Sequence, residues 1–214
     1  MRLTTLGVGA QNSPMYAPAG LLVAHGRVRV MIDGGPGAEP SGRLDAWLVT
    51  DDRAELMPAI RRLARARGLV PAVREFRSDG LVAEPMPVVH TNHPAFGYLI
   101  RGGGRTVVWA PEFLQFPSWA AEADLMFAEA AGWNRPIRFA GGVGGHLDAL
   151  AVADAARGNG VRRLVLAHIG RQTIRAMDRG ERPPFGEFGE DSREYVVRRS
   201  STRHDGGDRS SARG

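Results

Sequence analysis

The feature that most constrains this chain is the stretch from Pro87 to Glu112, PVVHTNHPAFGYLIRGGGRTVVWAPE. Apolar and β-branched residues on either side of three consecutive glycines predict two strands joined by a hairpin turn. The hairpin would bring His90 or His93 close to Glu112, where the second strand ends. Imidazoles beside a carboxylate are the components of a metal site or an acid–base pair. From this stretch alone, two solvated loop histidines are an equally good interpretation.

The composition indicates a globular protein with a single large domain. The chain has 214 residues, of which 43% are hydrophobic, and it has no apolar run of the roughly 18 residues that a membrane-spanning helix needs. It has no cysteine, so a metal would have to be held by His, Asp or Glu. The N-terminus lacks the apolar core of a secretory signal. We therefore predict a cytoplasmic protein with no membrane partner.

The sequence pI of about 10.7 is weak support for nucleic-acid binding. All 28 basic residues are arginine, so few groups titrate between histidine and arginine, and a net charge of only +5 places the pI very high. Residues 198–214 hold five Arg and two Asp, or +3. The body at 1–197 is therefore near +2, from 5 − 3. We predict a folded domain at 1–197 and a disordered Arg-, Ser- and Gly-rich tail at 198–214, which leaves the tail as the alternative nucleic-acid contact.

The first half of the chain reads as strands followed by one helix. Strands are expected at 2–8, 21–24, 28–32 and 45–50, and a helix at 56–67 that ends at Gly68. His25 and Gly26 would form a tight turn. The glycine-rich loop after Asp33 lacks the spacing of a dinucleotide site. Asp51, Asp52 and Glu55 would stabilise the start of the helix, which explains them without a ligand role.

The second half alternates strands and helices and carries two more histidines. Short strands are expected at 73–76 and 81–82, a turn and a short helix at 113–123, strands at 123–127 and 163–167, and helices at 147–157 and 171–179. His146 follows a run of glycines, and His168 comes directly after a buried strand. A histidine at a strand end is a site candidate, although a satisfied core imidazole is an equal alternative. From Glu181 the chain becomes rich in Pro, Gly and charge.

The order of these segments resembles the metallo-β-lactamase superfamily, in the branch of the tRNA 3′-processing endonuclease and the phosphodiesterase of phosphonate breakdown. The resemblance covers about residues 3–169. It is carried by LLVAHGRVRVMIDGGPG, PVVHTNHPAFGYLIRGGGRTVVWAPEF, ADLMFAEA and GGHLDALAVADAARGNGVRRLVLAHIG. The resemblance implies an α/β fold, the four-layer αβ/βα sandwich, with metals at one edge.

The resemblance also implies which residues belong to the site. His90 falls at the isolated ligand histidine of the family, with His93 as the alternative. Glu112 falls at the bridging carboxylate, His168 at the last ligand histidine, and His146 at a catalytic histidine near the scissile phosphate. The signature His-x-His-x-Asp-His is missing.

In place of that signature the chain has DDRAEL. Asp51 and Arg53 stand for the two leading histidines, Glu55 for the Asp and Leu56 for the final His. One metal would keep Asp51, His90 and Glu112, and the other would keep Glu55, Glu112 and His168. This oxygen-rich set suits Mn, Mg or Fe, with Zn also open.

Two functions follow from the resemblance. The first is a metal-dependent phosphodiesterase or esterase with an altered, carboxylate-rich site, in which Asp51, Arg53 and His146 are catalytic and the substrate is a small anion or phosphoester. The alternative is a metal-free pseudo-enzyme or binding protein, in which the Arg53 guanidinium replaces the metal charge beside the carboxylates. A nucleic-acid substrate is disfavoured because no RNA-gripping insertion is present. A homodimer is compatible with the sequence.

Overall fold

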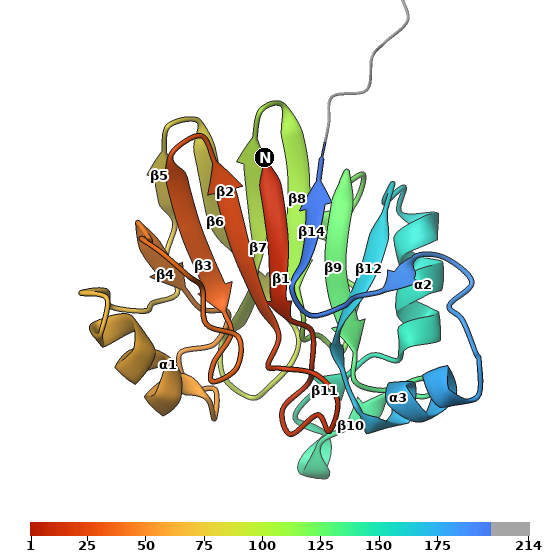
Figure 1. The fold of residues 1–214 in the computed structure, drawn as a ribbon. Helices are drawn as coiled ribbons and strands as arrows, with labels where there is room; N and C mark the ends of the chain where they lie inside the picture. The colour runs from red at the N-terminus through yellow and green to blue at the C-terminus, as the bar shows by residue number, and fades with distance from the viewer. Residues whose placement is uncertain (198–214) are drawn as a thin grey trace, which may run out of the picture.

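The computed structural model describes residues 1–197, and Figure 1 shows their arrangement. The predicted tail at 198–214 lies outside the described residues, so its disorder stays a prediction. One sheet contains β1 (Arg2–Gly7), β2 (Gly20–His25), β3 (Val28–Asp33), β4 (Ala46–Leu48) and β14 (Arg193–Val196). The other contains β5 (Phe76–Ser78), β6 (Leu81–Val88), β7 (Ala95–Gly102), β8 (Arg105–Ala110), β9 (Leu125–Ala130), β12 (Leu164–Ile169) and β13 (Glu187–Phe188).

The strand orders are β14-β1-β2-β3-β4 and β13-β12-β9-β8-β7-β6-β5. A separate two-stranded ribbon pairs β10 (Ile137–Arg138) with β11 (Gly145–His146). The helices are α1 (Met57–Arg65), α2 (Ala149–Gly158) and α3 (Arg171–Asp178), with the short 3-10 turns η1 (Ser118–Ala120) and η2 (Ala140–Gly142). Among the residues described, no helix combines the length and the apolar character needed to cross a membrane.

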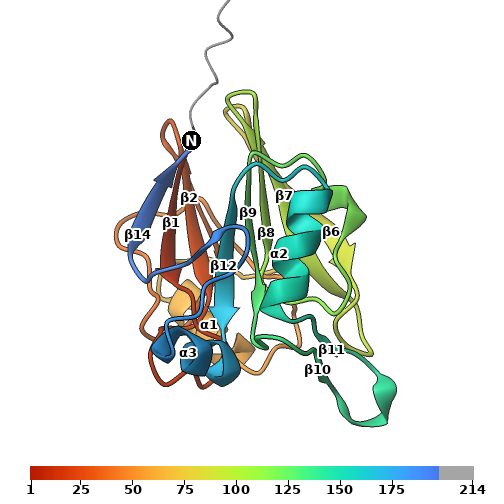
Figure 2. The same cartoon turned by 90° about the vertical axis from the view of Figure 1, so that its right-hand side faces the viewer.

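The two sheets face each other between helices (Figure 2). Alternate residues of β2 and β3 point to opposite faces, so Val23 and Val30 enter the core between the sheets while Leu22 and Met31 pack outward. The outward residues bury the apolar face of α1, and α2 lies on the outer face of the seven-stranded sheet. The predicted αβ/βα sandwich is therefore confirmed.

Local sequence explains where the helices begin and end. Pro58 occupies the first turn of α1, where a missing N–H costs nothing, and Gly68 takes a left-handed φ of 71° just after it. The α2 helix begins at Ala149 and not at Leu147, because the Asp148 side chain caps it by accepting a hydrogen bond from Ala151 N. The helix expected within 113–123 is only the 3-10 turn η1.

The predicted hairpin is β7–β8. Gly103 and Gly104 have φ of 61° and 70°, the conformation of a two-residue turn between antiparallel strands. Tyr98 pairs with Trp109 across the hairpin, and both side chains are fully buried. The hairpin thus delivers Glu112 to the edge where β8 ends.

Several strands differ from the sequence-based expectation. The strand expected at 73–76 is displaced to β5, and the short one at 81–82 extends to Val88 as β6. The strand expected to end before His168 includes it, as part of β12. Four strands were not predicted. β10 and β11 pair over only two residues each, and β13 and β14 pair with β12 and β1, of which β1 is distant in the sequence.

The parallel strands β8, β9 and β12 end at one edge of the large sheet. Because parallel strands bring their carboxyl ends together, side chains distant in sequence meet there. Glu112 follows β8, while Glu129 and His168 lie near the ends of β9 and β12. This edge holds the candidate site.

Candidate functional site

A cavity of about 640 Å³ opens at this edge. It is lined by all the residues to which the sequence assigned a site role, together with His93: Asp51, Arg53, Glu55, His90, Glu112, His146 and His168. Segments more than a hundred residues apart in the chain therefore converge on one cavity. The contacts among these side chains differ between the side formed by the large sheet and the side formed by the β4–α1 loop.

On the side of the large sheet, three imidazoles are held in the same way. Nδ1 of His90 donates to the Gly145 carbonyl (3.0 Å), and Nδ1 of His146 lies 2.7 Å from the Glu129 carboxylate. Nδ1 of His168 lies 3.3 Å from the other oxygen of Glu129. Each Nδ1 is thus anchored by a protein acceptor, which leaves each Nε2 to face outward. Metal-binding imidazoles are characteristically oriented by a hydrogen bond from the second ring nitrogen.

Glu112 lies between two of these Nε2 atoms. Its Oε1 is 2.8 Å from His168 Nε2 and its Oε2 is 3.4 Å from His90 Nε2. Burial would raise the pKa of the Glu112 carboxyl, but the charges of His168 and then His90 hold that pKa well below its usual range. His90 Nε2 and the Glu112 carboxylate thus face each other across a short gap.

His168 is placed between two carboxylates by an irregular backbone. It has φ of 55°, and the pairing of β12 with β9 shifts register between Leu166 and Ile169. A positive φ in a residue other than glycine is a strain that surrounding contacts must maintain. Burial would lower the pKa of the His168 imidazole, but Glu112 and Glu129 raise it to about 10. A proton therefore compensates the two anions in the metal-free protein.

Glu129 is a candidate site residue that the sequence did not reveal. Its side chain is fully buried, and its oxygens are contacted by Ala131 N (2.8 Å), Phe113 N (3.2 Å) and the two imidazoles. Burial would raise the pKa of the Glu129 carboxyl, but His146 and His168 lower it overall. The available signal was a single carboxylate in an otherwise apolar strand, LMFAEA, since a buried charge requires partners.

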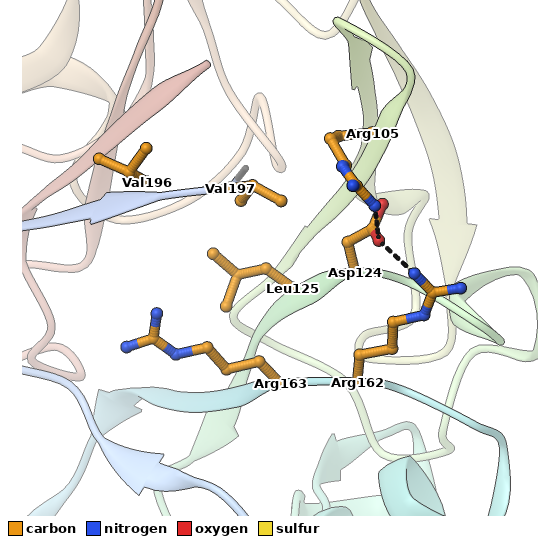
Figure 3. Close-up of a pocket in the computed structure, with 7 residues that line it drawn as sticks. All are labelled: Arg105, Asp124, Leu125, Arg162, Arg163, Val196 and Val197. Carbon is orange, nitrogen blue, oxygen red and sulfur yellow. Dashed lines mark hydrogen bonds and ion pairs between the residues drawn. The ribbon is translucent and has the colours of Figure 1, made fainter. Parts of the chain in front are cut away.

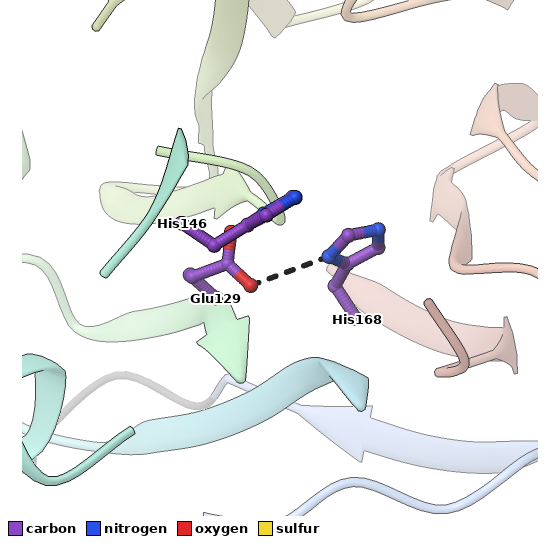
Figure 4. Close-up of side chains that lie close together, drawn as sticks. All are labelled: Glu129, His146 and His168. Atoms are coloured by element: carbon purple, nitrogen blue, oxygen red, sulfur yellow. Dashed lines mark hydrogen bonds and ion pairs between the residues drawn. The ribbon is translucent and has the colours of Figure 1, made fainter. Parts of the chain in front are cut away.

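Glu129, His146 and His168 form the one group of three acidic or imidazole side chains in residues 1–197 whose ligand atoms lie within 4.8 Å of one another (Figure 4). The group could hold a metal ion. We interpret Glu129 instead as the anion that fixes both imidazoles, because its oxygens already have four donors. The remaining ligand atoms at the cavity are Nε2 of the histidines and the oxygens of Glu112.

On the side of the β4–α1 loop, the two expected three-ligand sets do not converge. Asp51 Oδ2 contacts His93 Nε2 at 2.8 Å, and Asp51 Oδ1 accepts from Arg53 N at 2.7 Å. Of the two loop histidines, His90 faces Glu112, whereas His93 is used by Asp51. The Glu55 side chain is exposed and, within residues 1–197, forms no ion pair.

Arg53 does not occupy the place of a metal. Its side chain is exposed, and no ion pair links its guanidinium to Asp51 or Glu112 in the described chain. The expected bidentate pairing is absent because the Asp51 carboxylate is engaged by His93. The residues therefore fit a metal beside Glu112 and His168, and do not fit a second metal beside the β4–α1 loop.

Asp33 lines the cavity and connects three of the strands around it. Its carboxylate accepts hydrogen bonds from Thr50 N (2.7 Å) and Trp109 Nε1 (2.7 Å). Burial raises the pKa of the Asp33 carboxyl to about 6, against the lowering effect of these bonds. Asp33 thereby joins β3, the end of β4 and β8 beneath the cavity. The sequence showed this residue only as the start of a glycine-rich loop.

A second hollow, of about 200 Å³, lies at the opposite ends of the same strands (Figure 3). There Asp124 Oδ1 accepts from Arg105 (2.8 Å) and from Arg162 (2.9 Å). These residues stand at or just before the starts of β8, β9 and β12. We interpret the arrangement as an ion-pair network that ties the strands together.

The position of His90 depends on a close backbone approach by the β10–β11 ribbon. Gly145 N donates to His90 O (2.9 Å), and a Cβ on Gly144 would lie 1.9 Å from that same oxygen. Gly144 also has φ of 151°, a conformation almost confined to glycine. Only glycine at 144 lets the ribbon lie against the His90 loop.

We therefore expect Gly144→Ala to displace His90 and weaken divalent-metal binding about tenfold, as loss of outer-shell support does. Isothermal titration of Mn²⁺ into the protein stripped with EDTA measures this. Gly142→Ala is the matched control, because Gly142 also has a positive φ (71°) but its Cβ would meet nothing within 4 Å. Equal affinities for the two variants would show that the ribbon does not position His90.

Comparisons with known proteins agree on the fold. No protein-family model matches the sequence, and no curated protein matches it. Among solved structures, the metallo-β-lactamase fold protein YhfI from Bacillus subtilis has a TM-score of 0.71 at 16% identity, covering 91% of this chain and 98% of that one. Human tRNase Z, short form, has a TM-score of 0.69 at 16% identity, covering 92% and 100%.

A diphosphatase from the PhnP family has a TM-score of 0.67 at 15% identity, covering 91% of this chain and 97% of that one. The chain therefore has the metallo-β-lactamase fold, as the resemblance in the sequence implied. The site on this fold combines the Glu112 carboxylate with three anchored imidazoles. At these identities the likeness establishes the fold and leaves the activity to be argued from the site.

Proposed function

We propose that this protein is a metal-dependent hydrolase of small anionic esters, with phosphodiesters as the first class to test. The observation that carries the proposal is the common orientation of His90, His146 and His168, whose Nδ1 atoms are bound to protein acceptors while their Nε2 atoms face the cavity beside Glu112. Structural neighbours with the same fold include a diphosphatase and a tRNase Z. We place the protein in the cytoplasm, acting on a small molecule.

Glu112 and His168 would hold the ion, with His90 at the second oxygen of Glu112. Oxygen and imidazole donors without thiolate suit Mn, Fe or Zn. The ion would supply Lewis-acid stabilisation of the charge that develops on the ester oxygens.

The protein's own residues perform the remaining tasks. His146 is fixed by Glu129 and presents Nε2 to the cavity, where it can give a proton to the leaving group. Arg53 and Arg171 line the cavity and would attract an anionic substrate. Asp51, held by His93, keeps the loop that carries Arg53 in place through its bond to Arg53 N.

The alternative, a metal-free anion-binding protein, requires the Arg53 guanidinium to pair with Asp51 and Glu112. The exposure of Arg53 and the Asp51–His93 contact favour the metal-dependent proposal over it. Protein purified without chelator should accordingly contain stoichiometric metal. Metal far below that level, and unresponsive to added Mn²⁺ or Zn²⁺, would overturn the hydrolase and leave the alternative.

Turnover of bis-p-nitrophenyl phosphate tests the activity directly. His168→Ala should abolish it, because this change removes a proposed ligand from the cavity. His25→Ala is the matched control: His25 is the last residue of β2, its imidazole lies near Gly80 and Gly103, and it does not line the cavity, so activity should be retained. Unchanged turnover in the His168 variant would remove His168 from the site.

A further inference from the structure

Several apolar side chains line the cavity away from the proposed metal ligands. Leu56 stands where the resemblance expects the final ligand histidine, and its half-buried side chain lines the cavity. Its Cδ1 lies 3.5 Å from the position of a Cβ on Gly35, as does Pro18 Cγ. Ala54 and Ile60 line the same cavity. Hydrocarbon thus lines the place where the resemblance expects a metal ligand.

A second apolar surface comes from the β10–β11 ribbon, which projects from the body of the protein (Figure 2). Ile137 and Phe139 are half-buried and line the cavity. The Phe139 ring packs edge-on against His90 (centroids 5.5 Å apart) and His146 (5.3 Å). The histidines therefore fix the orientation of this ring beside the proposed catalytic groups.

Cationic groups accompany these apolar surfaces. Arg53 and Arg171 line the cavity and form no ion pair within residues 1–197, whereas the carboxylates of Asp51 and Glu112 are occupied by imidazoles. Two further acidic groups line the cavity without an ion pair among those residues: the exposed Glu55, and the half-buried Asp33, which accepts hydrogen bonds from Thr50 and Trp109. The two exposed guanidinium groups can therefore pair with an anion, and the half-buried hydrocarbon favours an apolar substituent.

We propose that the cavity binds anionic esters with an aryl or other apolar group, which contacts Leu56 on one side and Phe139 on the other. This inference rests on the proposed function, since it names the substrate class of the same site. The place where the resemblance expects the final ligand histidine is, in this sequence, an apolar subsite around Leu56. Burying apolar surface favours binding in proportion to the area removed from water.

The test uses two anions of equal charge, phenylphosphonate and methylphosphonate, titrated calorimetrically into metal-loaded and EDTA-treated protein. Phenylphosphonate should bind about 10- to 50-fold more tightly, as partial burial of one ring predicts. Leu56→Asn should reduce that preference about fivefold or more, by removing apolar contact. Leu56→Met should retain it.

Leu56 is well suited to this substitution. It occupies the N-cap of α1 without a side-chain capping bond and is only half-buried, so the substitution removes no capping bond and the variant should fold. Val143→Asn is the matched control, because Val143 lies at the tip of the ribbon, is 47% exposed and does not line the cavity. It should leave the preference unchanged.

Equal binding of the two phosphonates, or no binding of either, would overturn the apolar subsite. An aryl preference that survives Leu56→Asn would overturn its location. Because binding is measured with and without metal, the result is separate from turnover. A Leu56-dependent aryl preference in the EDTA-treated protein would support the subsite even if the hydrolase proposal failed.

Discussion

Glu112→Gln is expected to weaken Mn²⁺ and Zn²⁺ binding by at least about 100-fold. Loss of an outer-shell partner already costs about 10- to 100-fold in metal affinity, and this change removes a proposed ligand itself. The amide keeps the shape of the side chain but loses the charge that faces Nε2 of both His168 and His90. Calorimetric titration of the ion into EDTA-stripped protein measures the effect.

The control for this change is Glu84→Gln. Glu84 is a glutamate of β6 with a side chain 38% exposed, paired with Arg101 on β7, so metal affinity should not change. If Glu112→Gln retained full affinity, the ion would have to sit among Glu129, His146 and His168, the other group of suitable ligand atoms. The result therefore decides between the two candidate metal positions.

The local sequence was sufficient to predict those features of the fold that depend on backbone conformation at a few residues. Three consecutive glycines fixed the β7–β8 hairpin, and the hairpin fixed Glu112 at the sheet edge close to His90. The glycine after α1 ended that helix within two residues of the expected position. These features depend on backbone conformations that few residues adopt, so their signals survive in a single sequence.

Strand β6 continues past the predicted end at residue 82 although it contains two prolines. Pro85 and Pro87 pair with Tyr98 and Phe96 of β7, yet proline cannot donate to a second neighbour and suggests that a strand has ended. The neighbouring strand β5 reaches only Ala83 in its pairing with β6. Beyond that point β6 is an edge strand, where a missing donor has no cost.

The chemistry of the site depended on contacts that no local pattern carries. Glu129 is fixed by two histidines 17 and 39 residues further along the chain. The Asp51–His93 pair joins residues 42 apart and decides that Asp51 is engaged. The sequence could indicate which residues reach the cavity, but the partner of each carboxylate is set by packing of the two sheets.

Glu129→Gln is expected to lower the free energy of unfolding by about 3–5 kcal/mol, the range for breaking a buried ion pair by removing one partner. Glu129 is fully buried and accepts from two backbone N–H groups and two imidazoles. A glutamine would turn an NH₂ toward donors on one side, and would leave Glu112 as the one carboxylate in contact with His168. Urea unfolding of EDTA-treated protein, followed by tryptophan fluorescence, measures the change.

Glu194→Gln provides the comparison, because Glu194 is 50% exposed and lies 3.8 Å from the Arg2 guanidinium. Exposed pairs of this kind contribute about 0–1 kcal/mol. A loss below about 1 kcal/mol for Glu129→Gln would mean that the carboxylate is not the charged centre of the cluster. The orientation of His146 and His168 would then need another cause, and with it the argument that their Nε2 atoms are presented to the cavity for chemistry.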